Sequence, residues 1–139
     1  MDLTFSTTPP EANAYFALFG STGWNEDYRA SPADLDRANR HSWYTVSAYD
    51  GERLVGFGRI VSDTVLHAMV YDMIVAPDVQ RRGVGSQILV RLLQHCRAAG
   101  IRDVQLFCAK GKAPFYLRHG FDARPADAPG MELTRRADG

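Results

Sequence analysis

Two glycines and two arginines lie between a strand-like segment and a helix-like segment in the middle of the chain. Residues 71–75 have the β-branched and aromatic character of a buried strand, and after Gly85 apolar residues return at intervals of three and four, as on a helix. The first turn of a helix presents unpaired N–H groups and a partial positive charge, which attract an anion. Gly83 and Gly85 keep that backbone open, and Arg81 and Arg82 add positive charge. The turn has the chemistry of a pyrophosphate site, although a plain strand-to-helix turn could contain the same residues.

Two other phosphate-binding motifs fit this turn less well. A dinucleotide-binding turn would place a third glycine where this chain has Ile88, although Asp103 lies about as far downstream as a ribose-binding acid should. A P-loop would continue with Gly-Lys-Ser/Thr after the glycines, and this sequence does not. The preceding strands also form a hairpin series. A Rossmann-like fragment is therefore the less favoured alternative.

One acidic residue interrupts the apolar strand that leads into the turn. A carboxylate such as Asp72 costs free energy in such a strand unless it is paired or functional. It either takes part in proton transfer or serves as a structural partner for Arg59 or a backbone N–H group, and the sequence leaves both open. His67, at the exposed end of the strand, is a weaker candidate for proton transfer.

Hydrophobic periodicity and turn signals predict the elements around these residues. Asp50-Gly51 joins two strands as a hairpin, and Ser31-Pro32 has the cap and first-turn residues of a helix start. The order β-α-α-β-β-β-α-β-α-β-β predicts a mixed α/β sheet with one central crossover helix. Expected strands cover 3–7, 42–49, 53–61, 67–75, 104–108, a segment from 120, and 131–134; expected helices cover 10–19, 31–40, 84–99 and 111–118, with a loop at 21–31.

The composition is that of one globular domain. The chain has 139 residues, of which 45% are hydrophobic, and sixteen Lys and Arg balance sixteen Asp and Glu, so no net charge draws it to nucleic acid or to an anionic membrane. It has no apolar run of bilayer length and no signal-peptide pattern. Its cysteines, Cys96 and Cys108, are too few for a disulfide framework, and no cluster has metal-ligand spacing. We expect a cytoplasmic protein without a metal, with both cysteines buried and His95 at the surface.

Two motifs resemble the GNAT (GCN5-related) acetyltransferases. Residues 80–85, Gln-Arg-Arg-Gly-Val-Gly, resemble that family's Gln/Arg-x-x-Gly-x-Gly/Ala signature. Residues 115–121, Phe-Tyr-Leu-Arg-His-Gly-Phe, are similar to its downstream Phe-Tyr-x-x-x-Gly-Phe. Both occur in the family's order, with a helix and a strand between them, and the resemblance runs from about Ser42 to Thr134. Residues 71–77, 106–109 and 130–131 further resemble the small-amine branch of the family. That branch includes plant-type serotonin (aralkylamine) and glucosamine-6-phosphate N-acetyltransferases.

The resemblance implies a GNAT fold in a single domain, residues 1–139, with a mixed, mostly antiparallel sheet of about six to seven strands and flanking helices. The sheet would be splayed beside acetyl-CoA, between the strand ending at Val75 and the strand ending at Cys108. The last residues of the first strand would pair with the pantetheine arm through their main chain, and the turn would hold the pyrophosphate. The implied cofactor residues are Met73, Ile74, Val75, Arg81, Arg82, Gly83, Val84, Gly85 and Ser86.

The resemblance also implies catalytic roles. Tyr116 would be the general acid that protonates the departing thiolate, although a tyrosine on a short amphipathic helix is by itself more often part of a core. Asp72 is the candidate general base, directly or through water, because its strand would lie beside the expected thioester; its structural alternative stays open. Four aromatic residues come from elements that would border the acceptor, namely Trp24, Tyr28, Trp43 and Tyr44. For Trp24, packing between the first two helices is the more ordinary explanation.

The expected reaction is acetyl transfer from acetyl-CoA to a primary amine, a small molecule with an aromatic or short apolar body, by direct attack in a ternary complex. The alternatives are a non-catalytic acyl-CoA-binding sensor and an acetyltransferase that acts on a protein or peptide amine. Homodimer formation through exposed strand edges is left open.

Overall fold

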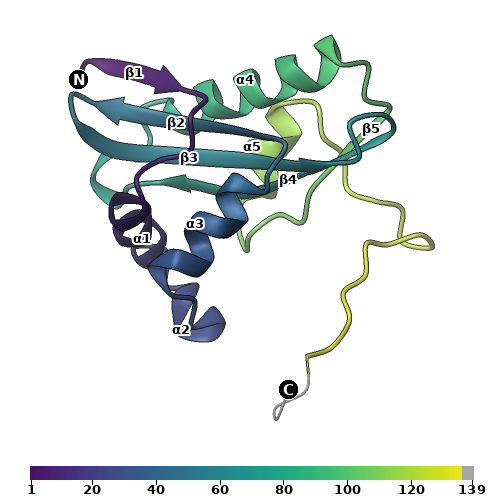
Figure 1. Ribbon diagram of the computed structural model, residues 1–139. Coiled ribbons are helices and arrows are strands. Elements are labelled where there is room, and N and C mark those ends of the chain that lie inside the picture. Colours follow the sequence, from purple (N-terminus) through teal and green to yellow (C-terminus); the bar gives the residue numbers. More distant parts are fainter. Residues whose placement is uncertain (136–139) are drawn as a thin grey trace. The chain divides into compact units, whose positions relative to one another are not determined.

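Two compact units make up the chain. The computed structural model describes residues 1–135, and the chain divides into Met1–Leu106 and Phe107–Gly139. Within its described residues, the first unit holds the sheet and most of the helices, and the second unit holds one short helix (Figure 1).

An open five-stranded sheet forms the centre of the first unit, with the order β1-β2-β3-β4-β5. β1 to β4 pair antiparallel, and β5 runs parallel to its neighbour β4. A parallel neighbour requires a crossover, which helix α4 (Val84–Ala98) supplies. The mixed, mostly antiparallel sheet is therefore confirmed. Its strands are β1 (Leu3–Ser6), β2 (Tyr44–Asp50), β3 (Arg53–Ser62), β4 (His67–Val75) and β5 (Asp103–Gln105).

The end of the chain contributes fewer strands than expected. Residues 120–135 contain no strand, so the strands expected from 120 and at 131–134 are wrong, and the sheet has five strands instead of six to seven. Met131 and Leu133 are 83% and 91% exposed, so these apolar side chains lack the buried face that stabilises a strand. β5 is also shorter than the expected strand 104–108.

Helices cover both faces of the sheet (Figure 1). α4 lies on one face, and α1 (Ala12–Gly20) and α3 (Pro32–Arg40) lie on the other. α3 begins with the expected cap at Ser31, whose side chain accepts a hydrogen bond from the Asp34 N–H. The loop expected between α1 and α3 instead contains a short helix, α2 (Asn25–Tyr28), whose two acidic residues suit a helix N-terminus.

Two glycines let α4 lie close against β3. A Cβ on Gly56 would lie 2.7 Å from Cδ1 of Ile88, and a Cβ on Gly58 would lie 2.9 Å from Cδ1 of Leu92. Neither position has room for a side chain. On the opposite face, the Phe57 ring meets a tyrosine of α1 edge to face, with 4.6 Å between the ring centroids. The core of the unit therefore lies on both sides of β3.

The second unit, as far as it is described, has one helix, α5 (Ala113–Arg118). Gly130 lies so close to Phe107 that a Cβ there would be 2.9 Å from the phenylalanine ring. Cys108 is exposed, contrary to expectation, because residues 106–109 form no paired strand; Cys96 on α4 is buried as expected. None of the helices in residues 1–135 has the length and apolar composition that a bilayer span requires.

Candidate active site

A tight turn connects β4 to α4 and contains the two glycines. After the 3-10 turn η1 (Pro77–Val79), Nε2 of Gln80 donates a hydrogen bond to the carbonyl oxygen of Val75 over 3.1 Å. Arg81 and Gly83 have φ angles of 66° and 80°, in the left-handed region. A residue other than glycine costs about 1–2 kcal/mol in that conformation. Arg81 therefore holds backbone strain in the turn that the sequence identifies as an anion site, whereas Gly83 adopts its φ without that cost.

The beginning of α4 is open and positively charged. Gly83 is its N-cap and provides no side-chain cap, and a Cβ built on Gly83 would meet nothing within 4 Å. The side chains of Arg81 and Arg82 are exposed. The first N–H groups of a helix lack intrahelical acceptors and form the positive end of its dipole. The turn thus offers backbone donors, two cations and free space, which suit a pyrophosphate.

β4 has neighbours on both sides only at its start. His67–Met69 pair with β5, whereas residues 70–75 lie beside β3 alone within the first unit. A strand paired on one side presents main-chain N–H and C=O groups along the other. The predicted cofactor residues Met73, Ile74 and Val75 lie on this stretch, directly before the turn. An extended ligand arm that contains amide groups can pair here as an added strand does.

A β-bulge lies in the same part of β4. Asp72 and Met73 together oppose the single residue Gly58 of β3, and Asp72 has a φ of 54°, which aspartate tolerates better than most residues. The Asp72 carboxylate accepts a hydrogen bond from Nε of Arg59 over 2.7 Å, and the two side chains are 21% and 17% exposed. The structural partner that the sequence left open for Asp72 is therefore present, in a pair largely removed from water.

Other polar groups are buried on this face of the sheet. Tyr15 on α1 is 1% exposed and Asn39 on α3 is 2% exposed; neither the Tyr15 hydroxyl nor Nδ2 of Asn39 has a hydrogen-bond partner among the described residues. Burial, and next the charge of Asp72, raise the pKa of the Tyr15 phenol well above its ordinary value. Sequence reasoning missed this cluster because Tyr15 lies on the apolar side of its helix, where any aromatic ring predicts core packing.

Tyr116 lies on α5, in the second unit. Its ring packs against Phe115 and Phe121, with centroid distances of 5.1 and 5.8 Å. Burial raises the pKa of the Tyr116 phenol, and negative charge at Cys108 raises it further. The ring is thus half-buried against two aromatic neighbours, and the raised pKa favours the protonated hydroxyl.

The aromatic residues predicted near the acceptor divide between the two faces of the sheet. Trp24 and Tyr28 lie against Phe19 of α1, with centroid distances of 5.8 and 6.1 Å. Trp43 lies against His95 of α4, with a centroid distance of 4.6 Å. His95 is half-buried rather than a surface residue, because aromatic rings of β2 and its preceding residue cover it. Only Trp24 and Tyr28 therefore share the α1–α3 face.

Comparison with known families identifies the chain. Residues 11–121 match the model of the acetyltransferase (GNAT) family. The chain belongs to this family. The match includes the turn at Gly83 and the segment of Tyr116, so the resemblance carried by the two motifs is confirmed.

Two curated relatives of this GNAT protein align with most of its length. It is 31% identical over 134 residues to serotonin N-acetyltransferase 2, chloroplastic, of Oryza sativa subsp. japonica, covering 94% of this chain and 66% of that protein. It is 31% identical over 126 residues to histone acetyltransferase TAP1 of Glycine max, covering 83% of this chain and 53% of that protein. The chain spans between about one third and two thirds of the length of the curated relatives it matches.

A solved structure has the same architecture. An acetyltransferase of the GNAT family from Streptococcus pneumoniae TIGR4 superposes with a TM-score of 0.82 at 27% identity, over 97% of this chain and 99% of that one. The predicted GNAT fold is therefore confirmed.

Proposed function

We propose that this GNAT protein transfers the acetyl group of acetyl-CoA to the primary amine of a small molecule, by direct attack in a ternary complex. The observation that carries the proposal is the uncapped, left-handed turn at Gly83, directly after the one-sided edge of β4. A ligand with a pyrophosphate and an amide-containing arm needs both features. Residues 81–86 would hold the pyrophosphate, and residues 73–75 would pair with the arm. Bound acetyl-CoA supplies the activated acetyl group.

Two side chains would carry out the proton transfers of the reaction, one as acceptor and one as donor. An amine attacks only after its ammonium form loses a proton, and the Asp72 carboxylate would take that proton directly or through water. Arg59 holds this carboxylate in place by the 2.7 Å hydrogen bond. Tyr116 would donate the proton that the departing thiolate needs. No covalent bond to the protein is required.

The acceptor site is proposed on the α1–α3 face. Trp24 and Tyr28 offer flat apolar surfaces on the face that carries Asp72, which attracts an ammonium group. Trp43, on the other face, has no role in this proposal. The relative named as a serotonin N-acetyltransferase supports an amine with an aromatic body, whereas the one named as a histone acetyltransferase supports a protein amine as the alternative. The cytoplasmic location and the homodimer stay predictions.

Ligand-dependent stability tests the cofactor. A ligand that binds only the folded state stabilises it by about 2.7 kcal/mol at a hundredfold excess over Kd, so CoA and acetyl-CoA should raise the melting temperature while NAD should not. Gly83→Val should abolish the rise, because valine is strained at this φ and fills the phosphate path. Gly100→Val is the matched control, because Gly100 has a φ of 73° and equally open surroundings at the other end of α4. No rise with millimolar CoA would refute the cofactor assignment.

Product formation tests the reaction. CoA release should be fastest with tryptamine, compared with glucosamine 6-phosphate and a lysine-containing histone peptide. Tyr116→Phe should keep the thermal shift with acetyl-CoA and lower kcat by about 10²–10⁴-fold, the usual contribution of a general acid. Tyr49→Phe on β2 serves as the control and should leave kcat unchanged. If acetyl-CoA binds but no amine causes release of CoA, the protein is a non-catalytic acyl-CoA-binding sensor and not an enzyme.

A further inference from the structure

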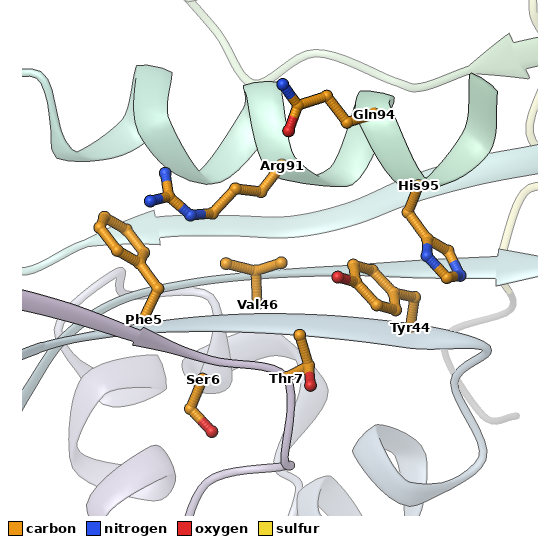
Figure 2. A pocket seen from close by; sticks show the side chains of 8 residues that line it. All are labelled: Phe5, Ser6, Thr7, Tyr44, Val46, Arg91, Gln94 and His95. Carbon is orange, nitrogen blue, oxygen red and sulfur yellow. The ribbon is translucent and has the colours of Figure 1, made fainter. Parts of the chain in front are cut away.

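A hollow lies between α4 and the first two strands. Its volume is about 390 Å³, within the range of small-molecule sites. β1 and β2 form one side and α4 forms the other, so the hollow is built on regular elements (Figure 2). The side chains that line it are Phe5, Ser6, Thr7, Tyr44, Val46, Arg91, Gln94 and His95.

The hollow is separate from the candidate active site. Arg91 and His95 follow Gly83 along α4 by about 12 and 18 Å, at 1.5 Å per residue. No lining residue belongs to the proposed cofactor, acceptor or proton-transfer groups. A ligand here would therefore leave the turn at Gly83 free for acetyl-CoA.

The hollow contains positive charge and no negative charge. Arg91 is always protonated, and no Asp or Glu lines the hollow. Among the described residues, no carboxylate forms an ion pair with Arg91. Its Nη1 donates a hydrogen bond to the Gln87 carbonyl oxygen over 3.2 Å, but a guanidinium has five N–H donors. Arg91 thus retains the capacity to bind an anion.

The Arg91 guanidinium is held in a fixed orientation. Its central carbon lies 3.6 Å from the centroid of the Phe5 ring, so the ring occupies one face of the guanidinium (Figure 2). The N–H donors lie in the plane of the group and remain available at its edge. Two donors at a guanidinium edge match the two oxygens of a carboxylate. This geometry favours a carboxylate over an ion that needs several converging cations.

Aromatic and apolar groups form the rest of the hollow. His95 stacks on Tyr44, with 3.6 Å between the ring centroids and 4° between the ring planes. The Tyr44 hydroxyl points toward Val46, which lies between Tyr44 and Phe5 (Figure 2). Val46 is 1% exposed and forms an apolar floor. Flat walls and an apolar floor suit a planar, apolar ligand body.

From these contacts we propose that the hollow is a second binding site, for a small aromatic monocarboxylate. The carboxylate pairs with the edge of the Arg91 guanidinium, and the aromatic body lies over Val46, between the Phe5 and Tyr44 rings. This site is independent of the proposed acetyl transfer and needs no acetyl-CoA.

The test is calorimetric titration of the protein with indole-3-acetate, in the absence of CoA. We expect indole-3-acetate to bind saturably. Indole-3-acetamide, which lacks the charge, should bind at least about tenfold more weakly. Arg91→Met keeps much of the apolar stem and should weaken indole-3-acetate binding by about tenfold or more. Arg97→Met, an exposed residue on the same helix outside the lining, is the control and should bind as the wild type does.

A second measurement on the wild type avoids dependence on the stability of a variant. Indole-3-acetate should shift the NMR signals of the Phe5, Tyr44 and His95 rings and leave the Gly83 amide unchanged. The proposal is overturned by absence of binding at millimolar concentration, by equal affinity for the amide or for inorganic phosphate, or by shifts at Gly83 instead. None of these outcomes bears on acetyl transfer, so the two proposals fail separately.

Discussion

The two faces of the sheet are packed by different means. On the α4 face, Ile88 and Leu92 lie against glycines of β3, at distances that exclude any side chain there. On the α1–α3 face, a charged pair, Arg59 and Asp72, lies among buried polar groups that include the Tyr15 hydroxyl. The apolar face sets the distance between helix and sheet. On the polar face, burial of polar groups lowers the stability of the fold, and the same groups can take part in chemistry.

The bulge in β4 connects the two faces. It places Asp72 and Met73 opposite Gly58, so that the Asp72 carboxylate meets Arg59 on one face while a Cβ on Gly58 would lie 2.7 Å from the Met73 sulfur on the other. The position of the proposed base therefore depends on packing beneath α4. Substitutions on the two faces therefore measure separately how much each face contributes to the free energy of unfolding.

Arg59→Met should have the largest effect on stability. It leaves the Asp72 carboxylate in a largely buried position without its partner, and breaking a buried ion pair from one side costs about 3 kcal/mol or more. Urea denaturation gives the free energy of unfolding. The double variant Arg59→Met/Asp72→Asn removes the charge as well and should recover at least part of the loss. A single variant within about 0.5 kcal/mol of the wild type would show that solvent, not Arg59, stabilises Asp72.

Gly58→Ala should have the next largest effect. Its Cβ would meet the Met73 sulfur and the Leu92 side chain at distances below 3.0 Å, and overpacking of this kind costs about 2 kcal/mol. Gly20→Ala is the matched control, since Gly20 has no heavy atom within 4 Å of its built Cβ and no positive φ. Equal unfolding free energies for both variants would mean that α4 moves away from β3 without penalty.

Tyr15→Phe should have the smallest effect and the opposite sign. It removes a buried hydroxyl that has no described partner and keeps the ring on Phe57, so we expect a gain of up to about 1 kcal/mol. Because the folded state raises the Tyr15 pKa, the wild type keeps this proton above pH 10.0, where the unfolded chain loses it. Wild-type stability should therefore fall relative to the variant as the pH rises above that value. A destabilised variant whose pH profile parallels the wild type would reveal a bound partner for the hydroxyl.

Local signals in the sequence predicted the elements of the first unit well. The strand 67–75 has the bounds of β4, the hairpin turns at Gly51, and Ser31 caps α3. Each of these depends on residues close together in the chain, where turn and cap chemistry act. The Gly83 turn belongs to the same class, because its glycines, arginines and helix start are contiguous.

Features that depend on distant partners could not be predicted in this way. The bulge at Asp72 exists only in register with Gly58, and the hollow brings Phe5, Tyr44 and Arg91 together from separate elements. The strand expected at 131–134 has a strand-like composition, yet composition does not provide a pairing partner. The expected burial of Cys108 is wrong for the same reason: its apolar neighbours predict a strand at 104–108, but residues 106–109 have no pairing partner that would cover the cysteine.

The parallel pairing of β5 with β4 has a consequence for the order of folding. β2, β3 and β4 join through short turns, so their ladders can close early with little loss of chain entropy. The carbonyl oxygen of Leu66 accepts hydrogen bonds from the N–H groups of Arg102 and Asp103, at 3.1 and 2.9 Å, and these close the long excursion through α4. The segment between β4 and β5, which includes α4, must lose its conformational freedom before any of these hydrogen bonds can form. The hairpins of β2, β3 and β4 thus provide a template onto which β5 assembles later, as does β1, whose own connection to β2 runs through α1, α2 and α3.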